Sequence, residues 1–138
     1  MIYVSKSVKD TQKTAANLIK KLKNLKVTGA RVVALEGELG AGKTVFVKGL
    51  AKALKIKKEI KSPTFTIMKR YGNLYHLDCY RLKNEKDLAV LGIEEIFKDP
   101  KNIVLIEWSD RVKKILPKKH IEVHIDHISA KDRKISIK

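Results

Sequence analysis

The sequence predicts an α/β fold of three layers, with a largely parallel central sheet and antiparallel edge strands. Short apolar runs rich in β-branched residues, which are typical of buried parallel strands, alternate along the chain with segments of helical periodicity. Near the C-terminus, two segments instead alternate polar and apolar residues, as half-exposed antiparallel strands do. Together these patterns favour one mixed sheet covered by helices.

Length and composition limit the classes of protein that fit. The 138 residues predict one domain that covers residues 1–138, and hydrophobic and charged fractions of 43% and 33% fit a globular chain. No apolar run approaches the ~20 residues of a membrane helix, and residues 1–14 lack the apolar core of a secretion signal. Cys79 is the only cysteine, so we expect a cytoplasmic protein without membrane contact.

The charge balance is strongly basic. A formal net charge of +16, from 31 basic and 15 acidic residues, favours a polyanionic partner such as RNA. Lysine supplies 26 of the basic residues and is spread over the whole chain, which a compositional bias would also produce. No RNA-binding signature or aromatic platform accompanies the charge, so contact with tRNA, directly or through a complex, stays open.

The first half of the chain predicts a helix, a strand and a second helix. Apolar residues at helical spacing indicate a helix over residues 10–26, with Ser7 or Asp10 as its cap. The apolar, β-branched composition of residues 30–36 predicts a buried strand, and residues 43–54 show helical periodicity again. The glycine-rich segment between them therefore lies between a strand and a helix.

The second half predicts a hairpin, short helices and three more strands. Residues 62–82 read as a β-hairpin with turn chemistry at residues 71–73, and residues 84–97 as two short helices broken near Gly92. The remaining predicted elements are a buried strand, a short helix and an edge hairpin of two strands, at residues 102–108, 110–116, 120–126 and 133–138.

The glycine-rich segment matches the complete P-loop pattern, Gly37-x-x-x-x-Gly42-Lys43-Thr44. Glycines let the backbone curl so that several N–H groups point at phosphate oxygens, and the following helix adds the positive end of its dipole. Lys43 then reaches the terminal phosphates, and the Thr44 hydroxyl ligates Mg²⁺. The segment predicts ATP binding by residues Glu38, Leu39, Gly40, Ala41, Gly42, Lys43 and Thr44.

Hydrolysis requires a carboxylate near the metal, and the sequence offers two. Glu107 ends one apolar strand and Asp78 ends the second strand of the hairpin. Acids at the carboxyl ends of parallel strands face the same crevice as a phosphate loop. We expect Glu107 to bind Mg²⁺, and Asp78 to orient the attacking water or to join the metal's shell. Either acid could also be an ordinary charge at the end of a strand.

Four stretches in a fixed order make the prediction specific. They are GELGAGKT, SPTF, YHLDCYR and IEWSDR, which begin at residues 37, 62, 75 and 106. Together with Ser7 to Thr11 and the segment around Gly92, they resemble the bacterial TsaE family, also called YjeE, over nearly the whole chain.

The resemblance implies an accessory ATPase of tRNA modification. Members act in making threonylcarbamoyladenosine in tRNAs that read codons starting with A, together with the transferase TsaD and its companion TsaB. The implied role is to reset the TsaD–TsaB complex between turnovers, by water attack on the γ-phosphate of ATP with Mg²⁺. The implied catalytic residues are Lys43, Thr64, Asp78 and Glu107.

The resemblance also implies roles for single residues. Thr64 would sense the γ-phosphate or the metal in a first switch, and Asp78 would belong to a second switch together with Tyr80 and Arg81. Arg81 could serve there as an internal arginine finger, although the residue itself favours a structural ion pair.

Two more implied roles have plain structural alternatives. Trp108 would lie beside the site, although packing explains a tryptophan after a buried strand as well. Thr11 would touch the base or sugar of the nucleotide, although a helix cap would explain it equally well.

Three other functions fit part of the sequence. A small-molecule kinase would share the phosphate loop, but 138 residues leave little chain for a lid and an acceptor pocket. A nucleotide-gated binding module would bind ATP without turning it over. An RNA-binding protein would depend on its charge rather than on Lys43.

Overall fold

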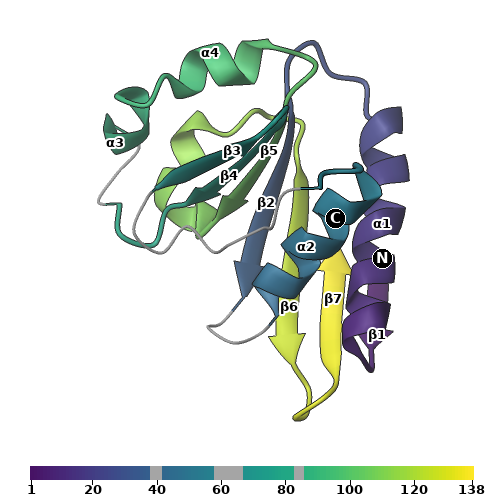
Figure 1. Cartoon of the computed structure of the whole chain (residues 1–138). Coiled ribbons are helices and arrows are strands. Elements are labelled where there is room, and N and C mark those ends of the chain that lie inside the picture. Colours follow the sequence, from purple (N-terminus) through teal and green to yellow (C-terminus); the bar gives the residue numbers. More distant parts are fainter. Residues whose placement is uncertain (38–41, 58–66, 83–85) are drawn as a thin grey trace. The chain divides into compact units, whose positions relative to one another are not determined.

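The structure is a computed structural model that describes residues 1–37, 42–57, 67–82 and 86–138, and Figure 1 shows its course. The chain forms two compact units. The first unit consists of Met1–Leu25, Glu36–Ser62 and Glu122–Lys138, and the second of Lys26–Leu35 and Pro63–Ile121. The assignment of residues 1–138 to one domain stays a prediction.

Helix α1, Val8–Asn24, has as its N-cap Ser7, one of the two caps that the sequence predicted. The hydroxyl of Ser7 accepts a hydrogen bond of 3.1 Å from the backbone N–H of Asp10. In return, the Asp10 carboxylate accepts one of 3.0 Å from the N–H of Lys6. The bond to Ser7 satisfies an N–H group that the first turn cannot pair internally, and the bond to Asp10 holds the residue before the cap. The helix starts two residues before the predicted range.

Helix α2, Lys43–Ala53, packs against α1 within the first unit, as Figure 1 shows. The contact is close at Gly49, where an added Cβ would lie 2.6 Å from the Cα of Gln12. No real side chain fits at that distance, so the absence of a Cβ at Gly49 sets how closely the two helices approach.

Three strands complete the first unit: β1 (Ile2–Ser5), β6 (Ile121–His127) and β7 (Arg133–Ile137). The predicted antiparallel pair of β6 and β7 is confirmed. Its placement as an edge hairpin is wrong for β7, because β1 pairs antiparallel with the other side of β7. Strand β1 was not predicted, since it has only four residues and two of them are exposed.

The second unit has a mostly parallel set of four strands: β2 (Arg31–Gly37, within this unit to Leu35), β3 (Met68–Tyr71), β4 (Leu74–Asp78) and β5 (Ile103–Glu107). Strand β5 pairs parallel with both β2 and β4, and β3 pairs antiparallel with β4. The predicted hairpin is confirmed with its turn, where Gly72 takes a φ of +63°. The largely parallel centre and the antiparallel edge agree with the predicted fold class.

Short helices cover one face of these four strands. Helices α3 (Lys86–Ala89) and α4 (Ile93–Lys98) meet at Gly92, whose φ is +75°, as the sequence predicted. A 3₁₀ helix, η1 (Ser109–Ile115), follows β5. These helices and strands share one apolar core, formed by Ala30, Val32, Tyr75, Leu77, Cys79, Leu82, Leu88, Ile93, Val104, Ile106 and Val112. Within the described residues, none of the helices combines the length and the apolar character that crossing a membrane requires.

We expect Gly49→Ala to destabilise the protein. Helix propensity alone would favour alanine over glycine by ~1 kcal/mol, whereas forcing a methyl group into a packed contact costs ~1–3 kcal/mol. The added Cβ would also lie 2.9 Å from the Cβ of Gln12, so the packing cost should prevail. Urea unfolding measures the free energy of unfolding of both proteins. A more stable variant would contradict the close contact between the helices.

Candidate nucleotide site

The segment that joins β2 to α2 carries the P-loop pattern. Gly42 takes a φ of +101°, a left-handed conformation that glycine adopts without strain. It is the N-cap of α2, and its carbonyl accepts a hydrogen bond of 3.0 Å from the N–H of Phe46. The predicted ligands Glu38, Leu39, Gly40 and Ala41 lie outside the described residues.

Lys43 and Thr44 form the first turn of α2. Lys43 is buried, with 7% of its surface exposed, and Thr44 is half-buried. The first turn contains no acidic residue, so its N–H groups and positive dipole end are not neutralised from within the helix. This arrangement suits a phosphate group, which is the ligand that the sequence predicted for Lys43, whereas the predicted role of the Thr44 hydroxyl as a Mg²⁺ ligand stays a prediction.

Asp78 and Glu107 lie side by side at the carboxyl ends of neighbouring parallel strands. The last residue pair of β4 and β5 is Asp78 with Glu107, and Leu35 of β2 is paired with Glu107 on the other side. The structure therefore brings both predicted acids to one edge of the strands. They lie level with Leu35, and the P-loop pattern begins two residues later, at Gly37. Which of them serves the metal and which the water stays a prediction.

The two carboxylates differ in burial and in their hydrogen bonds. Glu107 is 6% exposed, and its Oε2 lies 2.8 Å from Nε2 of His76. Asp78 is half-buried and accepts a hydrogen bond of 3.0 Å from the N–H of Tyr80. No role was predicted for His76 from the sequence. The signals that could have found it are its place in the stretch YHLDCYR and its position two residues before Asp78, because residues two apart on a strand share a face.

Cys79 lies in the core of the second unit, next to this acidic edge. Burial, and to a smaller extent the charges of Asp78, Asp110 and Glu107, together raise the pKa of its thiol from 9.0 to about 12. The thiolate is disfavoured both by the apolar surroundings and by three carboxylates. The side chain is thus an inert packing group at ordinary pH.

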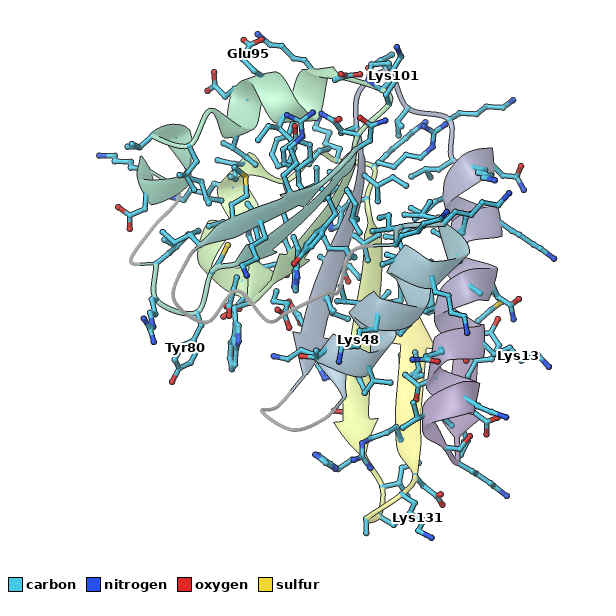
Figure 2. All side chains as sticks on the ribbon, viewed as in Figure 1. Lys13, Lys48, Tyr80, Glu95, Lys101 and Lys131 are labelled. Atoms are coloured by element: carbon cyan, nitrogen blue, oxygen red, sulfur yellow. The ribbon has the colours of Figure 1, made fainter. Side chains whose placement is uncertain are left out.

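Two aromatic side chains lie next to the acids in sequence. The rings of Tyr80 and Trp108 are 4.9 Å apart between centroids and tilted by 55°. Trp108 is half-buried, whereas Tyr80 is 47% exposed, and Figure 2 shows it pointing outward. Trp108 follows the last residue of β5, Glu107, and both its place beside the site and its effect on water stay predictions.

The remaining predicted residues are Thr11 and Thr64. Thr11 is buried, and its Oγ1 lies 2.6 Å from Oγ of Ser5. The Ser5 hydroxyl already donates to the carbonyl of Ser7, so Thr11 is the donor in this pair. Thr11 is not the helix cap, which is Ser7, and its contact with a nucleotide stays a prediction. Thr64 lies outside the described residues.

The oxygen donors on these elements fit a magnesium ion. Mg²⁺ is usually held by one or two protein oxygens, with phosphate and water as its other ligands. Thr44 offers a hydroxyl, and Glu107 keeps Oε1 outside its hydrogen bond to His76. Within the described ranges, no group of three or more His, Cys, Asp or Glu side chains could hold a metal ion. Taken by itself, each of these two residues offers one oxygen of the kind that Mg²⁺ takes from proteins.

The parallel strands β2, β4 and β5 and the helix α2 are those of an α/β protein with the P-loop fold. The crystal structure of YdiB from Bacillus subtilis matches 99% of this chain with a TM-score of 0.76 and 30% sequence identity, and the match covers 83% of YdiB. This likeness confirms the predicted fold class.

Sequence comparison assigns the family. A family model described as threonylcarbamoyl adenosine biosynthesis protein TsaE matches residues 5–135. The tRNA threonylcarbamoyladenosine biosynthesis protein TsaE of Treponema pallidum is 36% identical over 97% of both chains. The protein of the same name from Bacillus subtilis is 39% identical over 76% of this chain and 67% of its own length. The chain belongs to the TsaE family, as its motifs predicted.

We expect the Cys79 thiol to resist alkylation in the folded protein. The thiol titrates near 9.0 when unfolded and near 12 when folded, so the folded state holds its proton more tightly. This contribution to folding stability is complete below pH 9 and is lost as pH rises through about 12. Since Cys79 is the only cysteine, labelling by a thiol reagent at pH 8 with and without denaturant checks it directly. Rapid labelling without denaturant would contradict the burial.

Proposed function

We propose that this protein binds ATP with Mg²⁺, hydrolyses it, and serves the threonylcarbamoyladenosine modification of tRNA. One observation carries the chemical part: the register that sets Asp78 and Glu107 level with Leu35, two residues before the P-loop pattern begins. Membership of the TsaE family supports the biological part, because the relatives are named for this biosynthesis.

Each residue has a distinct part in the proposed hydrolysis. The N–H groups at the start of α2 and the Lys43 ammonium bind the phosphates and offset their charge. Thr44 and Glu107 hold the metal through a hydroxyl and a carboxylate oxygen. Bound there, Mg²⁺ would neutralise charge on the phosphates. Asp78 orients the attacking water or joins the metal's shell, and Thr64 senses the γ-phosphate.

The proposed cellular role is accessory rather than metabolic. We place the protein in the cytoplasm with the transferase TsaD and its companion TsaB, where ATP turnover resets the complex between catalytic cycles. The triphosphate then drives a change of conformation and donates no group to a metabolite. A phosphorylated small-molecule product would favour the kinase alternative, and binding of ATP without any turnover would favour the gated module.

The Glu107→Ala variant tests this role. In a reaction with TsaD, TsaB, tRNA and supplied threonylcarbamoyl-adenylate, the wild type should lift product formation past one turnover per transferase. Loss of the metal-side acid should hold the variant near one turnover, since the metal would lose the carboxylate that is proposed to hold it. Product per transferase is read from modified tRNA. If the wild type does not raise the count, the proposed role is wrong; if both raise it equally, the role of Glu107 is wrong.

A direct contact with tRNA has one observation in its favour. Helices α1 and α2 carry eight lysines and one acid, Asp10, whereas the whole chain has 31 basic and 15 acidic residues. Exposed lysines recur at spacings that share a helix face, at positions 9, 13, 20 and 23 of α1 and 48 and 52 of α2. Figure 2 shows Lys13 and Lys48 projecting from these helices.

Charge-reversal variants can distinguish binding through the exposed lysines of α1 from an effect of the net charge of the chain. We expect Lys13→Glu with Lys20→Glu to weaken tRNA binding ~10-fold or more and to reduce its salt dependence by about one to two phosphate contacts. Lys101→Glu with Lys113→Glu changes the net charge equally on exposed positions of the second unit. Filter binding over a range of KCl concentrations measures both. Equal losses in the two variants would mean that only net charge matters.

A further inference from the structure

The histidine beside Glu107 is the feature that the proposed function leaves unexplained. In the β4–β5 ladder, His76 is paired with Leu105 and Asp78 with Glu107. Side chains two residues apart share a face, so His76 and Glu107 are diagonal neighbours on the face opposite the apolar core. Their side chains meet, with Nε2 of His76 2.8 Å from Oε2 of Glu107.

The contact is buried and directional. His76 is 0% exposed and Glu107 is 6% exposed, so water does not replace the hydrogen bond between them. The contact needs one proton between the two atoms, and with that proton on Nε2 the His76 ring donates to the Glu107 carboxylate oxygen. Within the described residues, His76 is the one hydrogen-bond partner of the Glu107 side chain.

The second ring nitrogen of His76 makes no hydrogen bond with the described residues that would stabilise the fold. Nδ1 is buried and has no hydrogen-bond partner among the described residues. An unpaired buried polar atom is a cost in folding, and an apolar pair of similar size would avoid it. The folding stability of the protein therefore does not explain why a histidine stands at this position. Its Nε2–H does have a clear effect on Glu107, because it fixes the position of one carboxylate oxygen.

We propose that His76 is a positioning residue that holds the Glu107 carboxylate in the orientation that offers Oε1 to the metal. The inference rests on the proposed function, in which Glu107 is a ligand of Mg²⁺. A glutamate has three side-chain torsions to restrict, and a hydrogen bond to one oxygen restricts the last of them before the ion arrives. His76 touches neither the ion nor the nucleotide, and it acts through Glu107 alone.

Two amide variants test this with matched size and polarity. The side-chain nitrogen of glutamine reaches the position of Nε2, whereas that of asparagine reaches only the position of Nδ1. We expect His76→Asn to weaken Mg²⁺ binding to the nucleotide complex ~10–100-fold and His76→Gln to stay within ~3-fold of the wild type. Binding of Mn²⁺ to the complex with ADP, followed by electron paramagnetic resonance, measures this without turnover. Nucleotide binding in EDTA should be equal in all three proteins.

The Glu107→Ala variant tests whether His76 affects the metal through Glu107. If His76 acts through Glu107, His76→Asn should cause no further loss of metal affinity once Glu107 is alanine. A second independent measurement is the tautomer of His76 in the wild type without metal, which nitrogen NMR reads directly. We expect the proton on Nε2, and finding it on Nδ1 would overturn the inference even if the variants fail to fold.

The outcomes separate this inference from the function on which it rests. If the wild type shows no metal-dependent nucleotide binding, the proposed function fails. If the wild type binds the metal and His76→Asn binds it equally well, the function stands and the positioning role is wrong. A loss that persists in the Glu107→Ala background would also overturn the inference, because His76 would then act by another route.

Discussion

The central constraint is the parallel pairing of β5 with a strand on each side. Slipping a strand by one residue moves every side chain to the opposite face. Val104 and Ile106 lie in the helix-covered core, so the alternating positions, Leu105 and Glu107, must lie on the other face. The same holds for β4, whose core residues alternate with His76 and Asp78. The apolar core thus fixes where the acids lie, although none of its side chains takes part in the proposed chemistry.

Local signals predicted most of the fold, and non-local pairing accounts for the errors. The break at Gly92 and the turn at Gly72 are confirmed because a glycine with positive φ marks each of them. The interior place of β7 was not predictable, since it depends on pairing with β1 at the other end of the sequence. The same reason explains why His76 was missed: its significance comes from a residue 31 positions away.

The acidic edge of the second unit contrasts with the chain as a whole. In a protein of net charge +16, the carboxylates of Asp78, Glu107 and Asp110 lie close enough to Cys79 to raise the pKa of its thiol. The thiol therefore reports a concentration of negative charge at the ends of these strands. The strand-end rule predicted the two acids, but neither their different burial nor the field they produce with Asp110 could be read from the sequence.

The backbone of Trp108 has a consequence for how its role can be studied. Its φ of +58° lies in the left-handed region, which is costly for a bulky side chain and cheap for glycine. Replacing it with glycine would relieve the backbone while removing the ring that packs on Tyr80. The two effects on the free energy of unfolding have opposite signs, so a melting curve can stay unchanged while the surroundings of Glu107 are altered. Thermal stability therefore does not report on changes at this position.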